Sequence, residues 1–151
     1  GDPQKGKEIF LTHAAGQCAK CHKLNGDGGV AGPEVTGIGT RHDAKYILES
    51  LVAPSAQIVP GYGLTLATLK NGESVGGTLL SESDESITLK IPDPDGSEEL
   101  IEKVIPLSEI ESRQPPASAM PPMGYLLQKS EIRDLVAFLA SSKEKSPKKG
   151  H

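Results

Sequence analysis

Two cysteines and a histidine within five consecutive residues carry the clearest chemistry in this sequence. The segment Cys18-Ala19-Lys20-Cys21-His22 has C-x-x-C-H spacing, and no other cysteine occurs among the 151 residues. Two thiols at this spacing can each form a thioether with a vinyl group of one porphyrin, as in c-type haem attachment. The imidazole that follows Cys21 would then ligate the iron from the proximal side. The sequence therefore predicts one covalent haem c, attached to Cys18 and Cys21 and ligated by His22.

Zinc binding and dithiol redox chemistry are the alternatives for this pair of cysteines. A zinc site needs two further strong ligands at comparable spacing, whereas the other histidines, His13, His42 and His151, are scattered. A thioredoxin-like pair normally follows a strand and opens a helix in a βαβ unit. Here the pair follows a predicted helix and precedes a glycine-rich stretch, residues 25–33. Both alternatives fit the sequence less well than haem attachment.

The second axial ligand of such a haem has to come from another part of the chain. Both methionines, Met120 and Met123, lie in a proline-rich stretch before the last predicted helix. A thioether is a soft, neutral ligand for haem iron, and His/Met ligation raises the reduction potential. Methionine also serves as core filling, for which a proline-rich loop is a less favourable place. We predict Met120 as the ligand, and Met123, His13, His42, water or no sixth ligand are the alternatives.

Three segments have the spacing of apolar residues that is typical of helices. The first runs from Pro3 to about residue 14, with proline in the favourable first turn. The second covers about 44–53 and has Asp43 as its N-cap, and the third covers about 130–141 with Ser130 as its N-cap.

A block of different character, residues 62–113, lies between the second and third predicted helices. Apolar and polar side chains alternate in it, as they do in half-buried strands. Asn71-Gly72 and residues 93–96 are strong turn signals. Strands are predicted at about 64–68, 75–80, 86–91 and 100–104, followed by a short turn and strand at 106–110. Short strands without intervening helices form an antiparallel meander or a small SH3-like barrel.

Composition and charge exclude two classes of partner. The net charge is −4 and no basic stripe with interleaved aromatic residues is present, so nucleic-acid binding has no support. No apolar run approaches the ~20 residues that a membrane span requires. No signal peptide is visible at the start of the sequence. Because covalent haem attachment normally takes place outside the cytoplasmic membrane, we expect a processed or excised piece of an exported, periplasmic or equivalent extracytoplasmic protein.

Taken together, the motifs give the chain a resemblance to class I cytochrome c. In that family a Gly-x-x-x-aromatic pair on the first helix crosses an aromatic residue on the last, and Gly6, Phe10 and Phe138 match these places. A Gly-Pro pair, matched by Gly32 and Pro33, follows the haem motif. The resemblance implies that the Pro33 carbonyl holds the proximal imidazole, which would fix the ring and raise its basicity.

A Met-Pro pair before the last helix extends the resemblance, and Met120-Pro121 matches it better than Met123-Gly124. More specifically, the chain is similar to the haem-binding domain of planctomycete and verrucomicrobial proteins over about residues 5–141. The matching segments are 32–39, 46–50, 54–55, 61–62, 118–121 and 134–139.

This resemblance implies a mainly α fold, that of a class I cytochrome c, with an inserted small antiparallel β-subdomain. Its parts would be an N-terminal haem-attachment part at 1–61 and the insert at 62–113. A C-terminal part with the axial methionine would follow at 114–141, then a flexible tail at 142–151.

The function implied is one-electron transfer by a monohaem protein that is not itself an enzyme. Family members are often C-terminal parts of large exported proteins with a sugar-dehydrogenase-like propeller. We therefore expect a fused or transiently docking dehydrogenase as the electron donor. A haem-based ligand sensor or peroxidase-like enzyme with a labile sixth ligand is one alternative, and a binding module with a structural haem is another. The sequence makes no prediction of the oligomeric state.

Three further residues are candidates for contact with the haem propionates. Arg41 follows the glycine-rich stretch, and a guanidinium suits a carboxylate through bidentate bonding. Tyr46 and Tyr62 could each offer a hydroxyl while packing an apolar ring. A solvated loop charge for Arg41, and core packing for the two tyrosines, are the alternatives.

Overall fold

The computed structural model of the chain describes residues 1–144. These residues form two compact units, one made of Gly1–Ala56 and the chain from Met120 onward, and the other of Gln57–Ala119. Of the described residues 32% are helical and 27% lie in strands, so the predicted mainly α fold class is wrong. The reason is that the α-helices are short and confined to the first unit, whereas the second unit is built from strands.

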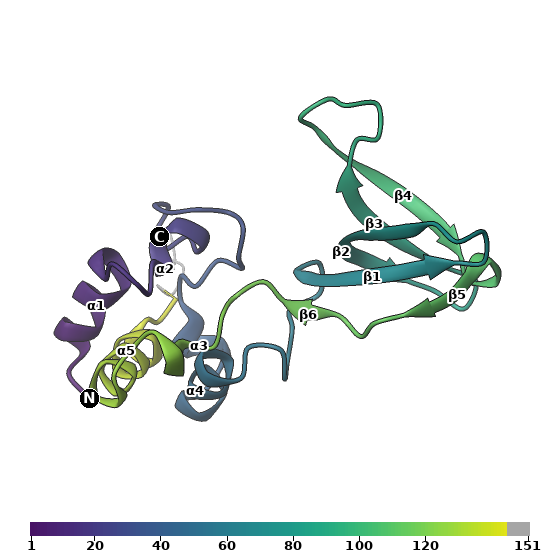
Figure 1. Ribbon diagram of the computed structural model, residues 1–151. Coiled ribbons are helices and arrows are strands. Elements are labelled where there is room, and N and C mark those ends of the chain that lie inside the picture. The colour runs from purple at the N-terminus through teal and green to yellow at the C-terminus, as the bar shows by residue number, and fades with distance from the viewer. Residues whose placement is uncertain (145–151) are drawn as a thin grey trace, which may run out of the picture. The chain divides into compact units, whose positions relative to one another are not determined.

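The first unit is a small group of helices joined by irregular segments (Figure 1). Helix α5 lies between α1 and α4 and contacts both. The elements are α1 (Pro3–Thr12), α2 (Cys18–Cys21), α3 (Ile38–Arg41), α4 (Ala44–Val52), the 3-10 helix η2 (Met123–Tyr125) and α5 (Lys129–Ser141).

Side-chain caps explain where α1 and α4 begin. The Asp2 carboxylate accepts a hydrogen bond from the N–H of Gln4 at 2.9 Å, and Pro3 occupies the first helical position. The Asp43 carboxylate accepts from the N–H of Tyr46 at 2.8 Å. A carboxylate at this position satisfies an N–H that has no partner within the helix. The predicted N-cap of α4 is therefore found in the structure.

Helix α5 begins differently from the sequence prediction, since its N-cap is Gln128 rather than Ser130. The Glu131 carboxylate accepts a hydrogen bond from the Gln128 N–H at 2.7 Å, which is the reciprocal half of a capping box. The bond from Gln128 to Glu131 thus places the N-cap two residues before Ser130.

Helices α1 and α5 cross at Gly6. A Cβ atom at this position would collide with the Asp134 carbonyl oxygen of α5, so only glycine allows so close an approach. One turn later the rings of Phe10 and Phe138 pack in a tilted arrangement with centroids 6.1 Å apart. The core of the unit surrounds this crossing, and its buried members are Phe10, Cys18, Leu24, Val35, Ile47, Leu51, Met123, Leu127, Ile132, Leu135 and Leu139.

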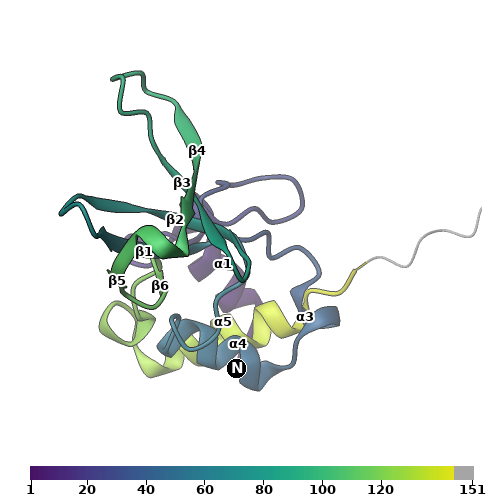
Figure 2. The ribbon, with the colours of Figure 1, turned by 90° about the vertical axis from the view of Figure 1, so that its right-hand side faces the viewer.

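The second unit is a twisted antiparallel sheet with strand order β4-β3-β2-β1-β5, and β6 also pairs with β1. Four strands form a meander, and β5 returns to the free side of β1. The connection between β3 and β4 projects beyond the other strands (Figure 2). The elements are β1 (Gly63–Leu69), β2 (Ser74–Glu82), β3 (Ser86–Pro92), β4 (Leu100–Pro106), the 3-10 helix η1 (Leu107–Glu109), β5 (Ile110–Arg113) and β6 (Ala117–Ser118).

Alternation along the strands gives this sheet a core of its own. In β1 every second residue is buried, so one face of the strand points inward. The buried members of this core cluster are Leu69, Val75, Ile87, Leu89, Ile91 and Ile105. None of them belongs to the core of the helical unit, so each unit buries its own apolar surface.

The unit boundaries differ from the predicted parts at two places. The sheet unit, 57–119, is longer at both ends than the predicted insert, 62–113. At the C-terminal end, residues 142–144 of the predicted flexible tail make hydrogen bonds to α3 and the glycine just before it, and residues 145–151 lie outside the described residues. Among residues 1–144, no helix combines the length and the apolar character that crossing a bilayer requires.

Candidate functional site

The C-x-x-C-H motif folds as the short helix α2, Cys18–Cys21, with His22 as its C-cap. Residues three apart on a helix lie on the same side, so the two thiols are about one turn apart. Both cysteines are free; Cys18 is buried, with 8% of its surface exposed, and Cys21 is exposed. Burial raises the pKa of the Cys18 thiol above its ordinary value.

The turn that leads into α2 is fixed by His13, which the sequence analysis named only as an alternative sixth ligand. Its Nδ1 accepts hydrogen bonds from the N–H groups of Ala15 at 3.2 Å and Gly16 at 3.0 Å. Because Nδ1 is an acceptor, the proton lies on Nε2, which donates to the Glu131 carboxylate at 3.2 Å. His13 therefore ties the approach to the haem motif to the first turn of α5.

The ring of His22 is oriented by the loop that follows the motif. Its Nδ1–H donates to the carbonyl oxygen of Pro33 at 2.7 Å. A carbonyl can only accept, so this contact places the proton on Nδ1 and leaves Nε2 with its lone pair. An imidazole in that tautomer is the form in which histidine ligates a metal.

Residues 28–33 wrap closely around α2 and the His22 ring. The Gly29 N–H donates to the Ala19 carbonyl at 3.0 Å, and the Gly32 N–H donates to the Cys21 carbonyl at 2.8 Å. A Cβ atom at Gly32 would lie 2.6 Å from Cε1 of His22, which is closer than real Cβ contacts allow. The absence of a side chain at Gly32 therefore lets the loop lie flat against the imidazole.

These residues fit a covalently attached haem. Two free thiols stand one helical turn apart, and the adjacent imidazole has its Nδ1–H engaged and its Nε2 lone pair left for iron. Within residues 1–144, no three His, Cys, Asp or Glu side chains are grouped so as to bind a metal ion. A zinc site at the two cysteines therefore has no further ligands in the part of the chain that the structure describes.

The two methionines of the proline-rich segment occupy different environments. Met123 begins η2, and its side chain belongs to the buried core with 3% of its surface exposed. Met120 is partly buried and packs against the same core cluster. The two thioethers, which the sequence could separate only by their neighbours, thus differ clearly in burial.

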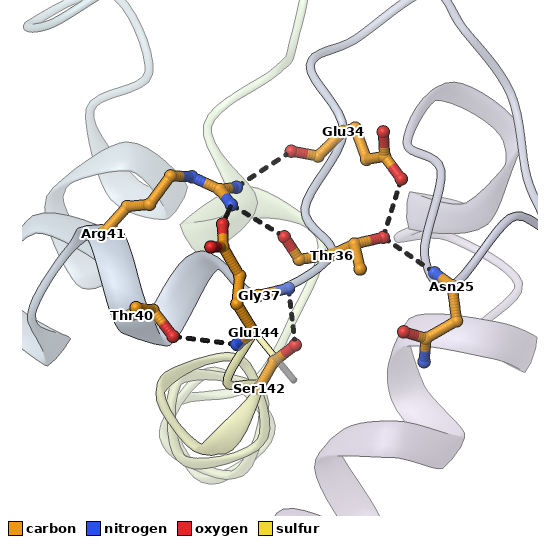
Figure 3. Close-up of polar contacts among 8 residues, drawn as sticks. All are labelled: Asn25, Glu34, Thr36, Gly37, Thr40, Arg41, Ser142 and Glu144. Atoms are coloured by element: carbon orange, nitrogen blue, oxygen red, sulfur yellow. Dashed lines mark hydrogen bonds and ion pairs between the residues drawn. The ribbon is translucent and has the colours of Figure 1, made fainter. Parts of the chain in front are cut away.

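The other predicted site residues lie on α3, on α4 and in the sheet unit. Arg41 ends α3, and its guanidinium donates to the Thr36 carbonyl and to the Glu144 carboxylate, each at 2.8 Å (Figure 3). Tyr46 lies on α4 and stacks on the His42 ring with centroids 3.7 Å apart. Tyr62 belongs to the sheet unit and immediately precedes β1.

Comparison with known proteins places this site in a family. A family model described as Cytochrome c matches residues 3–84, more than half of the chain. The matched region contains the C-x-x-C-H motif, Pro33 and the whole of the first two strands, and it ends before Met120 and α5. No curated protein matches the chain. The chain belongs to the cytochrome c family and is a haem-based electron-transfer protein.

Proposed function

We propose that the chain is a monohaem electron carrier of class I type, with Cys18 and Cys21 attaching the haem and His22 and Met120 as axial ligands. When bound, the haem supplies one reversible one-electron step between ferric and ferrous iron. The observation that carries the proposal is the 2.7 Å hydrogen bond from His22 Nδ1–H to the Pro33 carbonyl, directly beside the two free thiols.

This hydrogen bond gives the chain control over the properties of its proximal ligand. A donor bond from Nδ1 fixes the rotation of the ring and raises the basicity of Nε2. A more basic imidazole favours the ferric state, so the bond lowers the reduction potential relative to a free ring. The Pro33 carbonyl is therefore a positioning group that adjusts the potential without touching the iron.

Met120 is the proposed thioether ligand because Met123 is already used by the core. Withdrawing Met123 would leave a cavity beneath η2, and emptying a methionine site in a core costs about 2–5 kcal/mol. Met120 is only partly buried and packs against this core cluster without being one of its buried members. Burial thus supports the same choice as the Met-Pro sequence.

Tyr46 and Tyr62 are proposed as donors to the haem propionates on the basis of their chemistry alone. For Arg41 a propionate bond would have to add to the bonds with Thr36 and Glu144. The guanidinium has five N–H donors, so such an addition is chemically feasible.

The proposed electron donor is a dehydrogenase, either fused to this chain or docking transiently, in an exported location. The similarity to the planctomycete and verrucomicrobial haem-binding domain supports this proposal. The similarity implies a β insert at 62–113, and the sheet unit at 57–119 lies at a corresponding place between the haem motif and Met120. Contacts between redox partners are typically small and weak, so binding should be transient if the donor is a separate protein.

A redox titration of the purified holoprotein, followed by visible spectroscopy, tests the proposal. A c-type spectrum in the pyridine-haem assay, and a single reversible transition that fits a one-electron Nernst curve, are expected. The Cys18→Ser/Cys21→Ser variant should retain no haem after denaturation in acid. An unsubstituted protein without covalent haem would contradict the proposal. A ferrous haem that is oxidised only when a small molecule binds to its iron would also contradict simple electron transfer.

A further inference from the structure

We propose that the three residues after α5 form a clasp with Arg41 that positions His22, the proximal ligand. The C-terminal clasp is defined here as Ser142, Lys143, Glu144 and Arg41. It acts through the segment that carries the Pro33 carbonyl and does not touch the histidine itself. The inference deepens the proposed function and rests on it, because it concerns the ligand that the proposed function assigns to His22.

The clasp binds α3 and the glycine that precedes it from the C-terminal side of α5. The Ser142 carbonyl accepts from the Gly39 N–H at 2.8 Å, and the Ser142 hydroxyl accepts from the Gly37 N–H at 3.1 Å (Figure 3). The Thr40 hydroxyl accepts from the Glu144 N–H at 2.8 Å. Lys143 donates to the Gly39 carbonyl, and its backbone forms a β-bridge with Ile38. The chain after α5 is therefore bonded along the whole of α3.

The guanidinium of Arg41 joins this end of the chain to the loop after the haem motif. One terminal nitrogen donates both to Glu144 Oε1 and to the Thr36 carbonyl, each at 2.8 Å. The other terminal nitrogen donates to the Glu34 carbonyl at 3.4 Å. A planar guanidinium has its donors in a fixed fork, so it sets the two carbonyls and the carboxylate relative to one another. A lysine ammonium lacks this fixed fork and would not hold the three acceptors in the same arrangement.

The loop segment that receives these bonds is also fixed from its other side. The Thr36 hydroxyl accepts from the Asn25 N–H and donates to the Glu34 carboxylate, both at 2.8 Å. The Val35 N–H donates to the Lys23 carbonyl at 2.9 Å, and the Val35 side chain is buried. Residues 34–36 are therefore bonded on one side to the residues just after the haem motif and on the other to the clasp.

The consequence for His22 follows from chain connectivity. Pro33, whose carbonyl accepts the His22 Nδ1–H bond, is followed directly by Glu34, whose carbonyl accepts from Arg41. An isolated exposed ion pair contributes little to stability. The Arg41–Glu144 pair, however, is one link in a connected set of hydrogen bonds that ends at His22. Loosening the clasp should lengthen the His22–Pro33 bond, reduce the basicity of Nε2 and so raise the reduction potential.

The test uses the holoprotein and five variants of the chain. Glu144→Gln removes the charge of the clasp but keeps an oxygen acceptor, and Arg41→Lys keeps the charge but removes the fork. A variant that ends at Ser141 removes the clasp residues after α5, and a variant that ends at Glu144 retains them. Glu82→Gln is the matched control, because it changes the Arg113–Glu82 ion pair of the sheet unit in the same way.

Two readouts separate positioning from a general loss of stability. The first is the reduction potential, measured well below the melting temperature. The second is the NMR hydrogen-exchange rate of the His22 Nδ1–H and the Val35 N–H in the reduced protein, compared with the amides of α1. Loss of the clasp should speed exchange at His22 and Val35 by about tenfold while the α1 amides keep their rates, because local opening is independent of global unfolding.

We expect the variant that ends at Ser141 and Arg41→Lys to give a raised potential and the full exchange effect, and Glu144→Gln to give a smaller change in the same direction. The variant that ends at Glu144 and Glu82→Gln should match the unsubstituted protein. Unchanged potential and exchange in the variant that ends at Ser141 would overturn the proposal. The proposal would also be overturned if Arg41→Lys shifted the reduction potential while Glu144→Gln and the variant that ends at Ser141 did not. That result would indicate that Arg41 contacts the haem directly. Failure of the proposed function is distinguishable, since it would appear in the unsubstituted protein as a missing histidine-ligated c-type spectrum.

Discussion

The imidazole of His22 is held by one short hydrogen bond and one close packing contact. The bond to the Pro33 carbonyl fixes the rotation of the ring, and Gly32 leaves room for the ring edge. Both come from a loop that closes over α2 through two backbone hydrogen bonds. The proposed ligand is thus already oriented in the absence of iron, and such preorganisation would lower the cost of forming the site.

Replacing Gly32 by alanine tests this packing. The new Cβ would meet Cε1 of His22 at 2.6 Å. If His22 is the proposed iron ligand, its ring cannot turn away from this contact in the holoprotein. We expect the free energy of unfolding of the holoprotein to fall by about 1–3 kcal/mol, the usual cost of overpacking. The apoprotein, whose ring is free to move, should lose less. Denaturant unfolding of both forms measures this.

Gly124→Ala is the matched control, because nothing lies within 4 Å of a Cβ built at that position. Its unfolding free energy should stay within about 0.5 kcal/mol of the unsubstituted protein, as for most surface changes. Equal losses from Gly32→Ala in the holoprotein and the apoprotein would show that the contact with the ligand ring is unimportant.

The two attachment cysteines should differ in reactivity before haem is attached. Burial covers the Cys18 thiol and raises its pKa, so less of it is thiolate at a given pH, whereas Cys21 is exposed. In the apoprotein, iodoacetamide should alkylate Cys21 about tenfold faster than Cys18 at pH 8. Because the pKa of Cys18 is raised, its alkylation rate should rise at a higher pH than that of an ordinary thiol. Peptide mass spectrometry over a pH series measures both rates, and equal rates would contradict the burial of Cys18.

At the scale of the elements, the α1–α5 crossing is what allows two distant parts of the chain to share one core. Helix α1 precedes the haem motif and α5 follows the methionine segment, and they meet at Gly6 and at the Phe10–Phe138 pair. His13 and Glu131 add a polar link at the end of α1. The two segments that supply the proposed axial ligands are therefore tied together through these helices.

Gly6→Ala should separate the two helices. The added methyl group would collide with the backbone carbonyl of Asp134, and backbone yields less easily than a side chain. We expect a loss of about 3 kcal/mol in the free energy of unfolding, at the upper end of overpacking costs. Gly16→Ala, whose nearest contact is a leucine methyl group at 3.4 Å, should change stability by less than about 0.5 kcal/mol. Similar urea midpoints for the two variants would rule out the close crossing.

Local signals in the sequence predicted most of these elements. Asp43 marks the start of α4, and alternation with turn residues marks the meander, because both depend on residues close in sequence. The start of α5 was misplaced because Ser130 is a better isolated cap than Gln128, and the capping box with Glu131 decides the outcome. The predicted fold class was wrong because the strands of the sheet unit are almost as large a part of the chain as the helices.

The same limit applies to the site. The spacing of Cys18, Cys21 and His22 is local, so the sequence is enough to propose their role, whereas the contact of Pro33 with His22 was expected only from a family resemblance. The bond between Arg41 and Glu144 joins residues more than one hundred positions apart. No local pattern marks such a contact, and the polar residues after α5 have the composition of a linker. Only the fold brings them together.

At the scale of the whole molecule, the chain consists of two units with separate cores. The helical unit contains every proposed haem ligand, and the sheet unit, 57–119, has a core made only of its own residues. A unit that buries its own apolar surface has the main requirement for folding alone. We therefore propose that the sheet unit is separable from the helical unit.

Replacing residues 57–119 by a flexible Gly/Ser linker should leave haem attachment intact. The isolated segment 57–119 should show a β-type circular dichroism spectrum and unfold cooperatively, although a unit of this size is marginal in stability. Haem content of the shortened protein and a melting curve of the segment are the measurements. A shortened chain that never matures to a holoprotein, together with an unfolded segment, would contradict separability.

The most direct test of the central claim is the spectrum of the oxidised holoprotein in the near-infrared, where ferric iron bound to a thioether has a weak charge-transfer band. We predict that the unsubstituted protein has this band, that Met120→Ala abolishes it, and that Met123→Ala retains it while lowering stability, since Met123 fills the core. Loss of the band in Met123→Ala with retention in Met120→Ala would reverse the assignment. A high-spin spectrum without the band in the unsubstituted protein would contradict His22/Met120 ligation.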